Sequence, residues 1–388
     1  MEIKQVFQVV NNATSQALGK EGILKEDLSN VVDVGNEVIN AEAVDNYVKS
    51  LVNHIGRVVF DNRAYSTSIP SVMMDSWEFG SVLEKITADI PEAHENDTWA
   101  LEDGKEYKQD TFYQPSVSAK FFNSKTTFEV PVSFTERQVK ESFSNAEQLN
   151  GFISMIENAV AKSLTIKLDS LIMRTVNNMT AETLVADLAG AEGTLDLTKT
   201  GKKAINLLAL YNEQAEEAIT KEKALRTPEF IRFASYIINL YADRVTKIST
   251  VFNVGGKERF TPVEDLNVVL LSDFASSSKV YLESDTYNNE LVKLPNAETV
   301  PYWQGSGEGY DIKDVSKISV KTSADGKHVT TDGILGVMFD KFALGVTNLD
   351  QRVTTHYNAK AEFYNNFYKS DAGFFNDLNE NFLVFFIA

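Results

Sequence analysis

The side chains that most often bind metals or act as nucleophiles are scarce in this chain of 388 residues. It has no cysteine, which excludes disulfides and thiolate metal sites. Its four histidines are His54, His94, His328 and His356, and no two are spaced four residues apart as on a zinc-binding helix. We therefore expect no metal centre and no cofactor.

The glycine-rich stretches do not match the patterns that bind nucleotides. Gly305–Gly309 lacks the G-x-G-x-x-G spacing, and no helical pattern follows it. Gly256–Lys257–Glu258 and Gly326–Lys327–His328 lack the serine or threonine that a P-loop places on magnesium. The sequence also contains no G-x-S-x-G nucleophile elbow. We interpret residues 305–309 as a flexible loop.

Carboxylates are abundant, and no pair of them stands out as a catalytic acid and base. The best calcium candidate, Asp285–Glu290, lacks the spacing and the glycine of an EF-hand loop, which favours a solvated helix start or turn. The formal charge of −18 argues against a nucleic-acid reader, which usually has a basic face. These observations favour a non-enzymatic protein. A metabolic enzyme whose site follows no known motif is the alternative from another class.

The densest acidic cluster lies between two β-type segments. Residues 92–110 carry seven acidic side chains against two lysines. The flanking residues 77–86 and 112–134 have the composition of two strands, which predicts a long two-stranded ribbon with an acidic tip. Because an isolated two-stranded ribbon is only marginally stable in water, we expect it to pack against another subunit.

Two helix-start signals follow the ribbon. Thr135–Gln138 fits the capping box T-x-x-Q, and Ser144–Glu147 fits S-x-x-E. Apolar residues then recur at helical spacing from Leu149 to Val176. The pattern predicts one helix over residues 144–178, about 50 Å long at the usual rise per residue. Such a helix suits an elongated body better than a compact enzyme.

Shorter elements complete an α+β pattern. We expect helices at 204–218 and 227–241, and strands at 251–254, 267–271, 334–339, 342–346, 352–357 and 382–388. The aromatic segment Glu362–Tyr368 is interpreted as a core or interface cluster. No apolar run is long enough to span a bilayer, and no signal peptide is recognised, so we expect a chain made in the cytoplasm without membrane contact.

The order of these elements resembles the HK97-type major capsid protein of tailed bacteriophages. Residues 129–140 are similar to the family's passage from ribbon to spine helix, residues 284–292 to the middle domain in one phage group, and residues 333–382 to the end of such chains. The resemblance covers essentially the whole chain. It implies an HK97-type capsid fold with an N-terminal arm (1–62), an extended β-ribbon loop (63–134), a peripheral domain with the long spine helix (135–200 and 320–388) and an axial domain (201–319).

The same resemblance implies a structural protein that self-assembles into hexamers and pentamers of an icosahedral head around double-stranded DNA. The implied partners are other copies of the chain, portal and scaffolding proteins, and enclosed DNA without sequence-specific contacts. The implied location is the virion, after assembly in the host cytoplasm. An encapsulin-like nanocompartment shell protein, which would enclose a cargo enzyme, is the alternative within this fold.

On this view the functional residues are those that touch other copies. In the ribbon loop and its tip we expect these to be Glu95, Asp97, Trp99, Glu102, Lys105, Lys108, Phe112, Tyr113, Phe121 and Phe122. In a loop of the axial domain we expect them to be Gly305, Gly307 and Gly309. Some relatives link subunits covalently through lysine and asparagine, but no motif around Lys105 or Lys108 matches that link.

Overall fold

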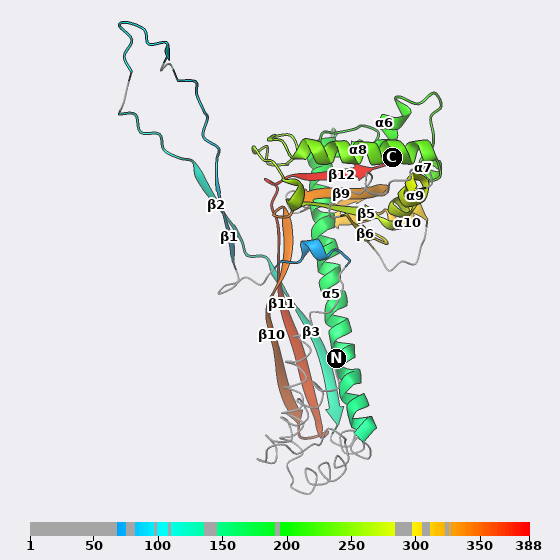
Figure 1. Cartoon of the computed structure of the whole chain (residues 1–388). Coiled ribbons are helices and arrows are strands. Elements are labelled where there is room, and N and C mark those ends of the chain that lie inside the picture. Colours follow the sequence, from blue (N-terminus) through cyan, green and yellow to red (C-terminus); the bar gives the residue numbers. More distant parts are fainter. Residues whose placement is uncertain are drawn as a thin grey trace. The chain divides into compact units, whose positions relative to one another are not determined.

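A computed structural model describes residues 68–74, 82–96, 99–107, 110–135, 146–190, 195–283, 297–304, 311–322, 326 and 328–388. These residues form helices and sheets in an α+β arrangement, which confirms the predicted fold class (Figure 1). The chain divides into two compact units: Met1–Ser76, Lys125–Arg174 and Val346–Gly373 form unit 1, and Trp77–Ser124, Thr175–Gly345 and Phe374–Ala388 form unit 2. Because compactness alone defines these units, the functional domain boundaries given above stay a prediction.

A five-stranded sheet forms the core of unit 2. Its order is β4-β12-β9-β5-β6, with β4 at Ala204–Asn206, β5 at Leu266–Leu271, β6 at Ala297–Val300, β9 at Ile334–Asp340 and β12 at Phe382–Phe386. Every residue of β5, β9 and β12 is buried. This explains why these strands are nearly continuous apolar runs in the sequence, interrupted by Asn267 and Asp340, and their prediction is confirmed.

Helix α8, at Pro228–Val245, packs against this sheet. The ring of Tyr241 meets Phe385 of β12 edge-on, with 5.9 Å between ring centroids, and Figure 1 shows α8 running beside β12. The helix starts at Pro228 as predicted, where the missing N–H of proline costs no helical hydrogen bond. Thr227 precedes it, but its hydroxyl donates to the Lys223 carbonyl instead of capping the helix.

Short helices surround the same core. They are α6 at Leu207–Asn212, α7 at Lys221–Ala224, α9 at Ser272–Glu283 and α10 at Ile312–Val315, with a 3₁₀ turn, η4, at Val263–Asp265. The strands β7 (Ile318–Lys321) and β8 (His328–Thr331) form a separate antiparallel pair. Gly333 follows this pair with φ +89°, and a Cβ there would lie 2.0 Å from the Ile387 carbonyl oxygen. Only glycine therefore fits this turn.

Two sequence predictions in this region are wrong. Residues 204–206 form strand β4, and helix α6 ends at Asn212, so the predicted helix 204–218 is much shorter. Asn212 stops it, because its side chain bonds both the N–H and the carbonyl of Ile219. The predicted strand 251–254 is a turn, because the Asn253 amide bonds both backbone groups of Lys257. Local side-chain bonds of this kind compete with regular structure.

Helix α5, at Ala146–Leu188, is 43 residues long, about 65 Å at the standard rise. The prediction of a long helix is confirmed, but the helix continues ten residues beyond 178. From Thr175 to Leu184 nearly every residue is buried, so the one-sided apolar pattern disappears there. Thr180 and Thr183 donate their hydroxyls to carbonyls one turn earlier, which satisfies them inside the helix. Among the described helices, none is long and apolar enough to cross a membrane.

The sheet of unit 1 has three strands in the order β10-β11-β3, with β3 at Lys125–Thr135, β10 at Leu344–Asn358 and β11 at Phe363–Asn376; the last two begin or end in unit 2. A 3₁₀ turn, η1, lies at Pro70–Val72. On β11, Tyr364, Asn366 and Tyr368 are buried, so the aromatic segment is a core cluster as interpreted. The predicted strands 342–346 and 352–357 are one continuous strand, β10.

The ribbon is shorter than the sequence indicated. Strand β1 (Leu83–Ala88) pairs with β2 (Val117–Phe122), but β3 pairs with β11. The prediction of residues 112–134 as one limb of the ribbon is therefore wrong beyond Phe122. The break comes at Asn123–Ser124, where the chain passes from one sheet to the other.

Candidate subunit interface

The β1–β2 ribbon has two faces of different character. Because side chains alternate along a strand, Lys85 of β1 and its partner Lys120 of β2 lie on one face, and Ile86 and Ala119 lie on the other. The residues of β1 alternate between half-buried and exposed in step with this pattern. The half-buried face is turned toward the rest of unit 2, and the other is open.

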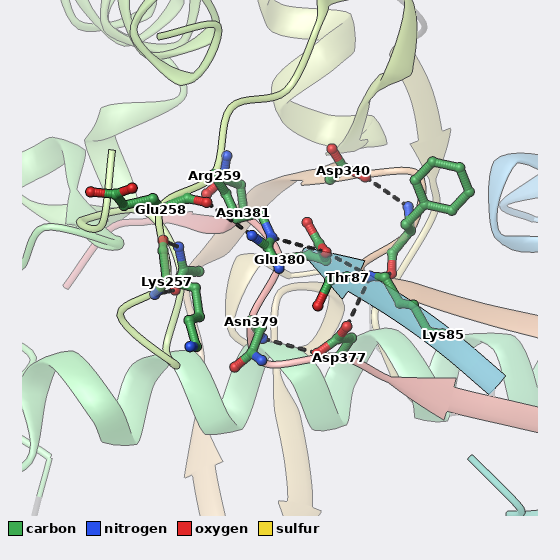
Figure 2. A network of polar contacts seen from close by, with 12 residues as sticks. Lys85, Thr87, Lys257, Glu258, Arg259, Asp340, Asp377, Asn379, Glu380 and Asn381 are labelled. Atoms are coloured by element: carbon green, nitrogen blue, oxygen red, sulfur yellow. Dashed lines mark hydrogen bonds and ion pairs between the residues drawn. The ribbon is translucent and has the colours of Figure 1, made fainter. Parts of the chain in front are cut away.

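An ion network fixes the half-buried face at the base of the ribbon (Figure 2). Lys85 Nζ lies 2.8 Å from Asp377 Oδ2 and 2.6 Å from Glu380 Oε1. Lys120 Nζ lies 2.8 Å from Asp377 Oδ1, so one carboxylate binds a lysine through each oxygen. Two lysines directly opposite each other in a ribbon repel, and Asp377 offsets that repulsion.

The acidic partners come from the turn between β11 and β12. Burial alone raises the pKa of the Asp377 carboxyl, but hydrogen bonds from Lys120 and Lys85 outweigh it and hold this pKa below its usual range. Glu380 also accepts a hydrogen bond from Arg259 Nε at 3.3 Å. The lysines of the ribbon thus bind the turn between β11 and β12, and Glu380 of that turn links them to the segment that contains Arg259.

Asp340 is a second buried acid beside this network. Its two oxygens accept 2.8 Å hydrogen bonds from the Phe342 N–H and the Thr261 hydroxyl. Burial nevertheless raises its pKa, and the nearby Glu380 charge adds to the rise. The pKa values of the neighbouring acids Asp377 and Asp340 are therefore displaced in opposite directions. Asp377 forms ion pairs with two lysines, whereas Asp340 forms none with a lysine among the described residues.

Apolar and polar contacts extend the attachment along the ribbon. The ring of Phe122 lies on Phe375, with 5.0 Å between centroids. Further along, Asp89 accepts a 2.7 Å hydrogen bond from the Ser116 hydroxyl, and Lys257 lies 3.7 Å from the same carboxylate. The hydrogen bond from Ser116, followed by the charge of Lys257, lowers the pKa of Asp89.

The open face of the ribbon is exposed and mostly apolar, with Glu84 as the charged residue among its β1 and β2 positions. Ile86 and Phe121 are each 64% exposed and Val117 is 59% exposed. In the loop between the strands, Trp99 is 97% exposed and Phe112 is 84% exposed. An apolar surface of this kind on a folded protein is typical of a site where another molecule packs.

The predicted contact residues fall into three groups. Glu95, Trp99, Glu102, Lys105, Phe112, Tyr113 and Phe121 are exposed in the ribbon and its loop. Phe122 instead contacts Phe375 in the same chain. Asp97, Lys108, Gly305, Gly307 and Gly309 lie outside the described residues.

Sequence reasoning missed the residues that hold the ribbon. Lys85 and Lys120 lie far in the sequence from Asp377 and Glu380, and none of the four belongs to a motif. The available signal is a lysine in the middle of each strand, with apolar residues on both sides of Lys120 and after Lys85. Among the described residues no group of three or more histidine or acidic side chains could hold a metal ion.

This chain is similar to known proteins of one family and to several solved structures. The family model described as Phi29-like phage major capsid protein matches residues 9–386. Similar solved structures include the capsid of Staphylococcus phage Andhra, at 9% identity over 84% of this chain and 87% of that chain (TM-score 0.49), and the mature capsid of bacteriophage PhiM1, at 7% identity over 84% and 88% (TM-score 0.47). The search among curated proteins gave no match.

Proposed function

Because a model of the Phi29-like phage major capsid protein family matches nearly its whole length, this chain belongs to that family, and we propose that it builds the hexamers and pentamers of an icosahedral head around double-stranded DNA. Membership in this family confirms the prediction, implied by the resemblance, that the chain is a major capsid protein of a tailed bacteriophage. The role of the protein is structural, as a component of the virion. The encapsulin-like alternative is not the family that the sequence matches.

The observation that carries the assembly proposal is the asymmetry of the ribbon. One face is fixed by Lys85, Lys120 and Phe122, while the opposite face exposes Ile86, Phe121 and Val117. A monomer gains nothing from exposing that apolar face to water. In a ring of identical subunits, each copy offers the same ribbon to its neighbour, so every exposed face becomes covered.

We propose the following roles for the parts of the chain. The ribbon loop, within 63–134, lies on the neighbouring subunit, and the domain at 201–319 surrounds the five- and six-fold axes. Residues 135–200 and 320–388 form the peripheral domain. Portal and scaffolding proteins are the proposed partners in head formation, which takes place in the host cytoplasm. Enclosed DNA makes no sequence-specific contacts.

Electron microscopy of the purified full-length chain, produced alone and together with its scaffolding protein, tests this function. We expect closed shells or capsomer rings in at least one preparation. Phe121→Ser removes the largest apolar side chain of the open face and should reduce assembly, whereas Phe260→Ser, at an exposed phenylalanine outside the ribbon, is the matched control. Folded monomers alone in both wild-type preparations would contradict the proposal.

A further inference from the structure

The buried face of the unit 1 sheet contains a side-chain amide among aromatic rings. Tyr364, Asn366 and Tyr368 follow one another at two-residue steps on β11, so their side chains share one face of the strand. All three residues are 0% exposed. An amide in such a place needs hydrogen-bond partners, because burying it without them costs free energy.

The amide of Asn366 lacks such partners within the chain. Its Oδ1 and Nδ2 atoms are both buried, and neither has a hydrogen-bond partner among the described residues. A flip of the amide, which exchanges these two atoms, therefore gains nothing. The neighbouring strand β3 offers no polar group either, since Val132 lies opposite Asn366 in the register of β11 and β3. Buried amides are normally satisfied, so this one requires an explanation.

Thr355 of β10 supplies a second buried polar group at the same place. The rings of Tyr357 and Tyr364 have centroids 4.7 Å apart, which places these residues opposite each other on neighbouring strands. A short turn at 359–362 joins β10 to β11, so the pair is antiparallel, and Thr355 lies opposite Asn366 two residues further from the turn. The Thr355 hydroxyl is buried and has no hydrogen-bond partner in the described part of the chain.

These two side chains meet the requirements of a water molecule. Opposite residues of an antiparallel pair have Cβ atoms about 4.5–5.5 Å apart, so one water molecule can reach both side chains. An internal water molecule needs several polar partners. The amide supplies donors and an acceptor, and the hydroxyl supplies a donor and acceptors, so both can bond the same water molecule.

We infer that Asn366 and Thr355 hold an internal water molecule that bridges β10 and β11 on the buried face of the unit 1 sheet. A metal ion fits less well, because both side chains are neutral and no group of histidine or acidic residues gathers to hold an ion among the described residues. A larger polar ligand also fits less well, since the buried residues Tyr364 and Tyr368 flank Asn366 on the same face. This site belongs to the fold of unit 1 and goes beyond the proposed function.

Isosteric variants of the full-length chain test the inference. Asn366→Leu and Thr355→Val keep the approximate shape of each side chain and remove its polar atoms. Magnetic relaxation dispersion of the water oxygen counts the long-lived internal water molecules of a folded subunit, and the double variant should contain about one fewer than the wild type. A wild-type crystal or cryo-electron microscopy map that resolves ordered water should show this molecule within hydrogen-bond distance of both side chains.

A double-mutant cycle distinguishes one shared water molecule from two independent polar groups. Each single variant leaves the water molecule with one partner fewer. It should lower the melting temperature by about 2–4 °C, the shift that the loss of one hydrogen bond gives in a folding unit of roughly 150–250 residues. The double variant removes both partners together, so its loss should be smaller than the sum of the single losses.

Asn365→Leu and Thr354→Val are the matched controls. They make the same changes at adjacent positions on the opposite face of the sheet, where Asn365 is half-buried and Thr354 is exposed. Asn365 accepts a hydrogen bond from the Ser133 hydroxyl, so its variant also controls for the loss of a side-chain hydrogen bond. Both controls should keep the wild-type number of internal water molecules, and circular dichroism establishes that every variant folds.

Three outcomes would overturn the inference. The first is an unchanged number of internal water molecules in the folded double variant. The second is a wild-type map in which another segment of the chain bonds the Asn366 amide. The third is a double variant whose loss equals the sum of the single losses. All three leave the proposed function untouched, because it fails only if the wild-type chain does not assemble.

Discussion

At the scale of single residues, Asp377 is the group on which the attachment of the ribbon depends most. Asp377→Asn leaves Lys85 and Lys120 opposite each other without their shared anion. We expect faster amide exchange in 83–88 and 117–122 and a stability loss smaller than the ~3–5 kcal/mol of a fully buried ion pair, since Lys120 is 40% exposed. Glu216→Gln is the control for loss of one exposed negative charge, and equal exchange in both variants would contradict this role.

The same carboxylate predicts an acid dependence. The pKa of Asp377 is lower in the folded chain than its ordinary value of 3.8, so its stabilising effect is complete above that value. This contribution is lost as the pH falls through the lowered folded pKa. Ribbon exchange in the wild type should therefore accelerate at the acid end, whereas in Asp377→Asn this part of the pH dependence should be absent.

Asp340 should act in the opposite sense. Its folded pKa is raised above 3.8, so the folded state holds this proton more tightly than the unfolded state. Its contribution to stability is complete below 3.8 and is lost as the pH rises through the raised pKa. The stability of Asp340→Asn relative to the wild type should therefore increase over that interval, as measured by urea unfolding at a series of pH values. A constant difference would contradict the raised pKa.

At the scale of elements, adjacent phenylalanines on β2 separate folding from assembly. Phe122 contacts Phe375, whereas Phe121 points to the open face. Phe122→Ala should destabilise the monomer, by less than the ~3–5 kcal/mol of a fully buried phenylalanine. Phe121→Ala should leave monomer unfolding unchanged and weaken assembly. Thermal unfolding and sedimentation of both variants check this, and identical behaviour of the two would contradict the division into faces.

What the sequence predicts well are elements with a single strong period or a continuous apolar run. Helix α5 from Leu149 to Val176 and strand β12 are of this kind, and the proline at the first helical position marks the start of α8 at Pro228. Prediction failed where local bonds or long-range pairing decide the structure. The amides of Asn212 and Asn253 end or replace elements, and β3 pairs with β11 more than two hundred residues away.

For the candidate interface, sequence reasoning located the exposed surface but not what holds it. The charge count identifies the acidic tip, and the family resemblance implies that Trp99 and Phe112, which are exposed, contact other copies. The lysine–aspartate contacts join residues 85, 120 and 377, and no local pattern encodes such a distant meeting.

At the scale of the whole molecule, the charge of −18 predicts weak binding to DNA. Electrostatic repulsion between a strongly acidic protein and the DNA polyanion is strongest at low ionic strength, where salt screens it least. We expect fluorescence anisotropy with labelled double-stranded DNA to show no tight complex at low salt, in either free subunits or assembled shells. Binding as tight as that of a basic protein of similar size would contradict this expectation.

Strand β12 lies between β4 and β9, and it pairs with Ala204 of β4 through Val384, 180 residues later in the chain. A ribosome that adds about 5–20 residues per second needs roughly 10–40 seconds to cover that interval. Throughout that time the emerging β4 lacks its partner in the central sheet. Unit 2 is thus incomplete until β12 has emerged from the ribosome. Before that point, neighbouring nascent chains cannot associate through a completed unit 2.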